Sequence, residues 1–584
     1  MNENLLSAME KRLTPEYEKM LKNIHAPKEV LIPPQDARRT LSVLPDGRIR
    51  AYGIDTDEYG EKRWVYYESE NCGLSWQIHY DDTVLQEFTY IPEKGRYITA
   101  KSKEKGYNDG LYVFYSDKGP DDPEPHVQKI WDVPVGDIFQ FQKSRYSDRI
   151  FFTAQHMDEN DFYPDIFYSD DFGETFSHVT LPLQPKQELV YPHKGYRWRY
   201  FTGSEPVLCE LSKDTLMLLI RNSTDCFFAC CSHDGGLTWS DYEKTGFYGT
   251  ATTAFLLPLS DGRILSLWNN TKPLPEVNHY RQDGLSDENK LGVWEDAFTN
   301  RDAAHAAVSD DGGKTWKGYR EIFLNPIRNN ADFRYAGGRF AKGDKSIHQF
   351  QAIELPYGKV LIALGQNAIS RRFLIMDLSY LYETSRKEDF IDGLNGVSSH
   401  MYLKSYNGAS GAEPNGHCQW NRFPGAVMMP DPTWDGKIGT PHREVVLIRK
   451  TDDDRLMTSI GGITWNFPMS RKGKVSAEIL LTEKSLRFTL SDRWFNSCDK
   501  YAGSLSPFTF EVDTDDIASG FVTVTIRYDV DARRAEVYAD EKFLFFVDGT
   551  REVPTGISYL ILQCVTDGDS KGAYIRELRA ERID

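Results

Sequence analysis

Side chains that could do acid–base chemistry or bind an anion are concentrated in a few segments of the chain. Two segments, ARRTLSVLPDGRIRAYG and SEPVLCELSKDTLMLLIRN, hold arginines, whose guanidinium groups bind carboxylates through charge-assisted, often bidentate hydrogen bonds. A third, GIDTDEYGEKRW, is rich in carboxylates, and a carboxyl group whose pKa is raised by partial burial can act as a general acid. A fourth, SIHQFQAIELPYGKVLIALGQ, holds a histidine, a residue type whose pKa near neutrality suits a base.

The overall charge of the chain limits its partners. The 584 residues include 69 Lys and Arg and 87 Asp and Glu, which gives a formal net charge of −18. Such a surface is expected to repel nucleic acid and anionic membranes, so we expect neither as a partner. An anionic ligand would need a local cluster of arginines against this background. The charge could also serve solubility alone.

The cysteines and the N-terminus bear on the compartment. None of the eight cysteines forms a CxxC pair or a Cys/His set with zinc spacing, so we expect free thiols in a reducing environment. The N-terminal segment lacks the apolar stretch of a signal peptide, which favours a cytoplasmic protein; a secreted form whose signal has been removed is the alternative. The sequence has no membrane-length apolar run, no metal-ligand spacing and no phosphate- or dinucleotide-binding loop. We therefore expect no metal and no cofactor.

Short strands joined by tight turns make up most of the predicted structure. Apolar residues recur at helical spacing between about Asn4 and Asn23, which predicts one amphipathic helix. Beyond it, apolar alternations bounded by Gly, Asp and Pro dominate, as in TLMLLIRN and FVTVTIRYDV. The sequence therefore predicts an all-β protein with a short N-terminal helix.

One eight-residue pattern, Ser-x-Asp-x-Gly-x-Thr-Trp, recurs in the first part of the chain. It occurs as SHDGGLTW at Ser232–Trp239 and SDDGGKTW at Ser309–Trp316, while Phe replaces Trp in SDDFGETF and Asn71 replaces Asp in SENCGLSW. The Asp can accept hydrogen bonds from turn amides, the Gly permits a positive φ, and the aromatic ring packs back between strands. We expect a structural turn that locks one hairpin per sheet.

This pattern is similar to the Asp-box, and its four copies resemble those of the sialidase (neuraminidase) superfamily of BNR-repeat proteins. The resemblance implies a six-bladed β-propeller over residues 28–385, preceded by an N-terminal helical segment at 1–27. A different series of alternating strands follows, such as KVSAEILLTEKSLRFTL. Residues 386–584 resemble a concanavalin-like lectin β-sandwich, which either binds carbohydrate or supports the propeller.

Members of this superfamily hold the carboxylate of a sugar with three arginines from different blades. Arg39 matches the first context, shortly before the first Gly-turn hairpin, and Arg38 is the alternative. Arg221 matches the second, one hairpin after a Glu-Pro pair, and Arg301 matches the third, just before an Asp-box strand. The resemblance implies that these arginines bind the substrate.

The resemblance also implies two carboxylates with chemical roles. Asp57, in the loop before the first Asp-box, matches the position of the family's acid/base, with Asp55 and Glu58 as alternatives. Glu205, in the Glu-Pro pair, matches the carboxylate that activates a tyrosine nucleophile in the family. A salt bridge to Arg221 is the alternative role of Glu205.

The chain departs from the family at the position of that tyrosine. Gln349 stands there, with His348 before it, and would bind substrate rather than attack it. An additional stretch, NPIRNNADFRYAGGRFAKGDK, could bring Tyr335 into the site as a nucleophile or Arg334 as a substrate-binding group. Alternatively, Asp57 is the acid of an inverting mechanism in which another carboxylate or His348 activates water.

Four further residues are open to a functional or a structural interpretation. His305 could act as a base, and Trp198, Tyr200 and Trp268 could stack on a sugar ring, although most such residues in a propeller belong to the core. The leading hypothesis is an exo-acting glycoside hydrolase that removes a terminal acidic sugar, sialic acid or a related sugar, from a glycan. A uronate-directed glycosidase or lyase on the same propeller is one alternative, and a non-catalytic glycan-binding protein is another.

Overall fold

The computed structural model describes residues 3–31, 36–56, 62–80, 85–104, 106–136, 138–139, 141–158, 161–183, 204–221, 226–249, 252–272, 301–324, 347–365, 371–402, 422–437, 443–453, 458–482, 484–566 and 571–583. Within these ranges the chain consists mainly of antiparallel sheets, with a few short helices. This confirms the all-β class. The seven cysteines that lie in these ranges are free thiols.

Two short helices, α1 (Glu3–Arg12) and α2 (Pro15–Lys22), occupy the segment for which the sequence predicts one helix. The break follows from Pro15, which has no amide hydrogen and therefore suits the first turn of a new helix. Thr14 caps α2, since its hydroxyl oxygen accepts a 3.3 Å hydrogen bond from the Tyr17 amide. No helix in the described part of the chain is both long and apolar enough to cross a membrane.

The described residues from Lys28 to Asp377 form six four-stranded antiparallel sheets. The first contains β2 (Asp36–Val43), β3 (Ile49–Thr56), β4 (Lys62–Ser69) and β5 (Gln77–His79), and the second β6 (Thr89–Ile91), β7 (Arg96–Glu104), β8 (Tyr107–Ser116) and β9 (His126–Trp131). The third contains β10 (Gln142–Lys143), β11 (Ile150–Asp158), β12 (Asp161–Ser169) and β13 (Ser177–Thr180), and the fourth β14 (Ser204–Ser212), β15 (Thr215–Arg221), β16 (Cys226–Ser232) and β17 (Glu243–Tyr248). The fifth contains β18 (Phe255–Pro258), β19 (Ile264–Trp268), β20 (Ala303–Ser309) and β21 (Lys317–Leu324), and the sixth β22 (Gln351–Leu355), β23 (Lys359–Leu364), β24 (Arg372–Asp377) and β1 (Lys28–Leu31).

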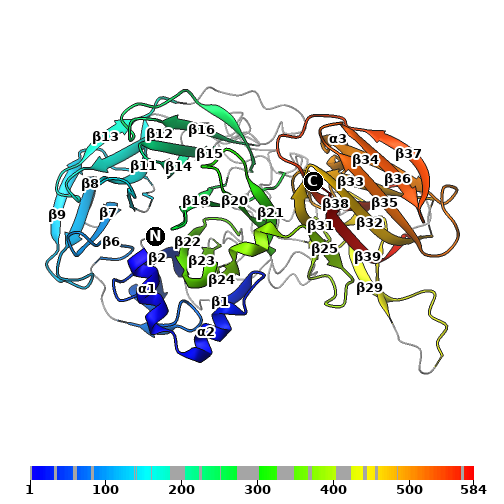
Figure 1. Cartoon of the computed structure of the whole chain (residues 1–584), viewed down its shortest axis with the longest axis horizontal. Coiled ribbons are helices and arrows are strands. Elements are labelled where there is room, and N and C mark those ends of the chain that lie inside the picture. The colour runs from blue at the N-terminus through cyan, green and yellow to red at the C-terminus, as the bar shows by residue number, and fades with distance from the viewer. Residues whose placement is uncertain are drawn as a thin grey trace.

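Hydrogen bonds near the first strands join each of these sheets to the next. In order, the donor and acceptor residues are Ser42 and Phe88 (2.7 Å), Thr89 and Phe141 (3.2 Å), Thr153 and Pro206 (2.6 Å), Thr253 and Glu205, and Ser260 and Glu354 (2.6 Å). A sixth bond, from the Leu41 amide to Gln351 at 2.5 Å, joins the first sheet to the sixth. The sheets follow one another around this part of the molecule (Figure 1).

The sixth sheet takes strands from both ends of this region. The N-terminal strand β1 pairs antiparallel with β24, so that Lys28 lies opposite Ile375. The preceding segment is fixed to the same sheet, since the Lys359 ammonium donates to the carbonyl of Ile24 at 2.7 Å. Two 3-10 helices, η3 (Pro356–Gly358) and η4 (Leu378–Tyr382), flank the sheet.

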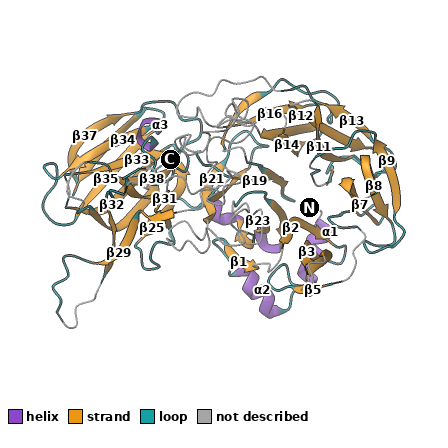
Figure 2. Cartoon of the chain, turned by 180° about the vertical axis from the view of Figure 1, so that it is seen from behind, coloured by secondary structure: helices purple, strands orange, loops and turns teal. Residues whose placement is uncertain are grey.

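Two larger sheets, called the C-terminal sheets below, follow in the chain. The eight-stranded sheet contains β29 (Ala426–Pro430), β30 (Glu444–Ile448), β39 (Ala573–Arg582), β32 (Lys472–Leu481), β35 (Val522–Asp529), β36 (Arg534–Ala539) and β37 (Lys542–Asp548), with β25 (Ser385–Glu388) paired to β39. The five-stranded sheet contains β26 (Val397–Ser398), β31 (Gly461–Ser470), β38 (Ile557–Cys564), β33 (Ser485–Ser491) and β34 (Phe508–Asp513). A two-stranded ladder joins β27 (His400–Tyr402) to β28 (Arg422–Pro424), and α3 is Ala502–Leu505. One hydrophobic core, with Ile526 from the larger sheet and Leu562 from the smaller, lies between the two (Figure 2).

The Asp-box turns are held by a repeated set of hydrogen bonds. In the fourth sheet, Asp234 accepts from the Ser232 hydroxyl at 2.8 Å and from the Thr238 amide and hydroxyl at 2.9 and 2.5 Å. The turns around Asp171 and Asp311 repeat these contacts. In all four turns, the glycine at the fifth position has a positive φ: Gly73 (85°), Gly173 (89°), Gly236 (98°) and Gly313 (83°). The carboxylate thus accepts hydrogen bonds from turn amides that have no backbone acceptor.

The first copy keeps the turn although Asn71 replaces the aspartate. The Asn71 side-chain oxygen accepts from the Ser75 amide at 2.9 Å, as the carboxylates do. Its nitrogen donates to the Ser75 hydroxyl at 2.7 Å, whereas in the other turns a threonine hydroxyl donates to the carboxylate. The direction of one hydrogen bond is therefore reversed while the geometry of the turn is preserved.

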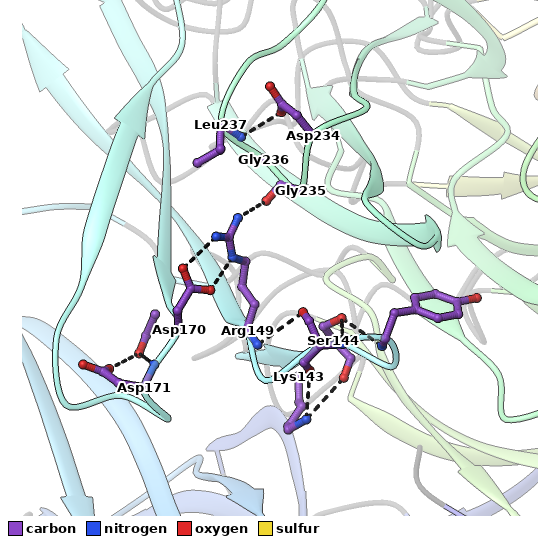
Figure 3. Close-up of polar contacts among 12 residues, drawn as sticks. Lys143, Ser144, Arg149, Asp170, Asp171, Asp234, Gly235, Gly236 and Leu237 are labelled. Atoms are coloured by element: carbon purple, nitrogen blue, oxygen red, sulfur yellow. Dashed lines mark hydrogen bonds and ion pairs between the residues drawn. The ribbon is translucent and has the colours of Figure 1, made fainter.

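Arginines tie neighbouring Asp-box turns together, as Figure 3 shows for the third and fourth sheets. Arg149 donates to both oxygens of Asp170, at 2.6 and 2.7 Å, and its remaining terminal nitrogen donates to the carbonyl of Gly235 at 2.7 Å. Arg96 makes the same type of link from the second sheet to the carbonyl of Phe172, at 3.1 Å. Charge-assisted bonds to the next turn therefore connect consecutive sheets at this end.

The carboxylates of the Asp-box turns are expected to make stability depend on acid pH. Burial raises the pKa of Asp311, but hydrogen bonds from Thr315 and Ser309 outweigh this effect and hold that pKa at about 2. Because the folded-state pKa is depressed, the stabilisation is complete above about pH 4 and is lost as the pH falls toward about 2. We expect the wild-type Tm to fall steeply across this window and Asp311→Asn to flatten the fall, since the Asn71 turn shows that the amide fits.

Thermal unfolding measured between about pH 6 and about pH 2.5 checks this dependence. Asp392→Asn, at an exposed position outside these turns, is the matched control and should leave the slope unchanged. A slope in Asp311→Asn equal to that of the wild type would contradict the assignment.

Candidate functional site

A cavity of about 850 Å³ follows the first strands of the six sheets. In each sheet with an Asp-box, the third strand ends in that turn and runs parallel to the first, so the first strands begin at the opposite end. Thr253, Gln349 and Arg371 line the cavity and precede β18, β22 and β24, which places them at this opposite end. The candidate site therefore lies away from the Asp-box turns.

A buried ion pair lies at this end of the cavity. Arg221, the last residue of β15, donates to the Glu205 carboxylate at 2.5 Å, and the two residues are 4% and 8% exposed. The hydroxyl of Thr253, from the fifth sheet, donates to the same carboxylate oxygen. The amide of Glu205 donates to the Gln155 side chain at 2.5 Å. The structure thus brings together the predicted pair Glu205 and Arg221, with Gln155 and Thr253 as neighbours that sequence reasoning missed.

Three non-glycine residues at this end of the cavity have a positive φ. Glu205, Gln349 and Glu87 have φ values of 51°, 60° and 61° and lie at or just before the starts of β14, β22 and β6. A left-handed conformation costs a non-glycine residue on the order of 1–3 kcal/mol and persists only where the surrounding structure enforces it. Such residues are frequent at functional sites, so the strain supports a site at this end of the cavity.

Arg301 and His348 form a second buried contact. Nη1 of Arg301 lies 3.2 Å from Nε2 of His348, and both side chains are buried. Because a guanidinium can only donate, Nε2 of His348 is the acceptor. Gln349, the next residue, lines the cavity, so the Arg301–His348 pair lies next to the cavity wall.

Arg371 is a candidate that the sequence interpretation missed. It is 3% exposed, lines the cavity with Gln349, and directly precedes β24. The sequence does contain a signal for Arg371. In SRRFLIMD an arginine pair precedes an apolar strand, as Arg301 precedes the strand AAHAAV. Gln351, by contrast, has its side-chain oxygen engaged by the Leu41 amide at 2.5 Å and joins two sheets.

Several predicted residues lie outside what the structure describes. Asp57, Glu58, Arg334, Tyr335, Trp198 and Tyr200 fall in the gaps between the described ranges. Arg39 and Asp55 lie on β2 and β3, where the backbone is described and their side chains are not. The roles assigned to these residues remain predictions.

His305 and Trp268 do not face the cavity, which corrects their interpretation as a base and a sugar-stacking ring. His305 is fully buried, accepts from the Asn270 amide at 3.0 Å, and has its other ring nitrogen 2.5 Å from the Tyr559 hydroxyl. Burial lowers the pKa of His305 to about 3. Trp268 is buried in an aromatic cluster with Phe247 and Tyr319. Both residues belong to the core.

The described residues contain no group of three or more His, Cys, Asp or Glu side chains that could hold a metal ion. The side chains described at this end of the cavity carry guanidinium, carboxylate, hydroxyl and amide groups. These groups can bind an anion and, with a suitably placed acid, transfer protons.

Residues 145–335 match the family of BNR repeat-like domains. This part of the chain is therefore a BNR repeat-like domain. The BNR repeat-like domain spans the third, fourth and fifth sheets, including the Asp-box turns around Asp171, Asp234 and Asp311, so the resemblance based on these turns is confirmed. No curated protein matches the sequence significantly.

Solved structures similar to this BNR-repeat protein include two sialidases. Trypanosoma rangeli sialidase in complex with 2,3-difluorosialic acid has 10% sequence identity, covers 94% of this chain and 91% of its own, and has a TM-score of 0.35. The NanB sialidase of Streptococcus pneumoniae has 11% identity, with 63% of this chain and 73% of that chain covered and a TM-score of 0.37. A protein of unknown function from Dyadobacter fermentans has 15% identity, with 60% and 97% covered and a TM-score of 0.38.

Proposed function

We propose that this protein is an exo-acting glycoside hydrolase that removes a terminal acidic sugar, sialic acid or a related sugar, from a glycan. The observation that carries the proposal is the buried Glu205–Arg221 pair on strained backbone at one end of the central cavity. Glu205 has a φ of 51°, and left-handed non-glycine residues are frequent at functional sites. The BNR repeat-like domain at residues 145–335 supports the same activity.

We infer that the six four-stranded sheets are the blades of one six-bladed β-propeller. The hydrogen bonds from each sheet to the next, and from the first sheet to the sixth, support a closed ring. We assign the propeller to residues 28–385, the helical segment to 1–27, and a lectin-like β-sandwich to 386–584. The shared core of the two C-terminal sheets supports the sandwich.

The arginines at this end would hold the carboxylate of the sugar. Arg221 and Arg371 reach the cavity region from the fourth and sixth sheets, and Arg301 lies beside Gln349 through its contact with His348. Arg39 lies on β2 in the first sheet, and the sequence assigns it to the same group of arginines. Arginines from several sheets converge on a carboxylate from different directions, which fixes the orientation of the sugar ring.

Proton transfer would fall to Asp57 and Glu205. Asp57 in its neutral form would protonate the oxygen of the leaving group, while a nucleophile attacks the anomeric carbon. Gln349 cannot supply that nucleophile, because a carboxamide neither ionises nor attacks readily. Tyr335, activated by Glu205, or a water molecule would take this role, and in the second case the anomeric configuration is inverted.

His348 is better explained as a partner of Arg301 than as the base. Its Nε2 lone pair is used by the Arg301 guanidinium, so His348 could accept a proton there only after this contact is broken. Glu205 is therefore the preferred base. The carboxamide of Gln349 in the cavity wall favours one second candidate, a glycosidase or lyase directed at uronates, because the tyrosine expected for sialosides is replaced.

Hydrolysis of a panel of aryl glycosides of acidic sugars, sialic acid and uronic acids included, tests the proposal. We expect the wild type to turn over one acidic glycoside. In Arg301→Ala we expect kcat/KM to fall by at least about 100-fold, because this variant lacks a guanidinium assigned to the carboxylate of the sugar.

Release from a uronate alone, or absorbance of an unsaturated product, would favour the second candidate. No turnover of any substrate, together with binding of an acidic sugar, would identify a non-catalytic glycan-binding protein instead.

A further inference from the structure

The loop after β33 lies against the end of β19. The Trp494 amide donates to the carbonyl of Asn270 at 2.9 Å, and the Lys272 amide donates to the carbonyl of Trp494 at 2.9 Å. The side-chain nitrogen of Asn270 donates to the carbonyl of Asp492 at 3.0 Å. Trp494 is fully buried, so the aromatic segment Arg493–Asn496 is a contact between the C-terminal sheets and the fifth sheet.

The segment held by this loop leads directly to the candidate site. The side-chain nitrogen of Asn269 donates to the carbonyls of Ala303 and Ile347, at 2.7 and 3.2 Å. The Ile347 amide in turn donates to the carbonyl of Arg301 at 3.0 Å. Asn269 therefore fixes the backbone beside Arg301 and the backbone that precedes His348.

Residues of the C-terminal half also hold the strand that follows Arg301. Nε2 of His400, on β27, lies 3.5 Å from the carboxylate of Asp302, and both side chains are at most 1% exposed. Two residues beyond Ala303, the ring of His305 contacts the Tyr559 hydroxyl, which donates to Glu321 at 2.9 Å. A carboxylate and two imidazoles with no exposure to water must keep their partners, because an uncompensated buried polar group is costly.

We infer that the C-terminal sheets complete the candidate site by positioning Arg301 and His348. His400 acts through Asp302, and the Asp492–Trp494 loop acts through Asn269 and Asn270. His400 and Trp494 are thus positioning residues rather than catalytic residues. The inference rests on the proposed function for its effect on substrate, but the positioning itself has a structural readout.

His400→Leu tests the inference, with His400→Gln as the conservative variant whose side-chain amide can still donate to Asp302. Hydrogen–deuterium exchange is measured for the peptide covering 347–365, together with the affinity for N-acetylneuraminic acid and galacturonic acid. In His400→Leu we expect exchange about 10-fold faster and the affinity for whichever acid the wild type binds about 10-fold weaker, with kcat less affected than KM. His400→Gln should remain within about 2-fold of the wild type.

Ile526→Val, in the core between the C-terminal sheets, is the control for a general loss of stability and should leave both readouts unchanged. If His400→Leu does not fold, Tyr559→Phe is measured instead, because it removes the hydroxyl that contacts His305 on the strand that follows Arg301. Native exchange and affinity in the folded variant would overturn the inference. A wild type that neither binds nor cleaves an acidic sugar would refute the proposed function, and exchange alone would then decide the positioning.

Discussion

Glu205→Gln is expected to lower kcat/KM by about 10²- to 10⁴-fold, the range typical for the loss of a general base. Glutamine has nearly the same shape, so its side-chain oxygen can replace the carboxylate oxygen that accepts from both Arg221 and Thr253. The packing around the pair is therefore retained, and the change removes mainly the charge and the basic lone pair. Steady-state kinetics on the substrate found in the glycoside panel, with Tm measured in parallel, checks this result.

Glu210→Gln is a closely matched control. Glu210 lies on the same strand, lines the cavity and is as buried as Glu205, at 8% exposure. Its carboxylate accepts from the Ser144 hydroxyl at 2.7 Å and the Arg145 amide at 2.9 Å, near the Asp-box end. We expect kcat/KM within about 3-fold of the wild type for this variant. Equal losses in both variants would indicate that Glu205 serves folding rather than chemistry.

Trp494→Ala is expected to destabilise the protein by about 3–5 kcal/mol, the usual cost of truncating a fully buried tryptophan. The ring is 0% exposed, and its indole nitrogen donates to the Ser398 hydroxyl at 3.3 Å. Because this side chain joins the C-terminal sheets to the fifth sheet, its loss should also weaken the coupling between the two parts. Differential scanning calorimetry should show one main transition in the wild type and two separated transitions in the variant.

Trp434→Ala provides the comparison, since Trp434 is 41% exposed on the C-terminal half. Its free energy of unfolding should be within about 0.5 kcal/mol of the wild-type value, so its calorimetric transition should coincide with that of the wild type. A single transition in Trp494→Ala at the wild-type temperature would show that the contact adds little to stability.

The parts of the fold that sequence reasoning predicted are those specified by local patterns. The Asp-box turns follow from residues within eight positions of one another, and the pairing of Glu205 with Arg221 follows from one hairpin. The single predicted helix was wrong at Pro15, where a local signal was overlooked.

The remaining features depend on residues that are distant in the sequence. His305 was open to interpretation as a base because its partner, Tyr559, is separated from it by more than 250 positions. The buried role of Trp494 depends in the same way on Asn270, in another sheet. No sequence motif marks Arg371, and its place on the cavity wall depends on how the sheets pack together.

The pairing of β1 with β24 has a consequence for synthesis and folding. The partner of β1 is the third strand of the sixth sheet, so β1 can pair only after nearly all of the six-sheet region has left the ribosome. Closing so large a loop is entropically slow. From the emergence of β24 until β1 pairs with it, the outer edge of β24 carries unpaired amides and carbonyls, which are a template for association with another chain. Nascent chains, and proteins trimmed at the N-terminus, should therefore be the forms most prone to aggregation.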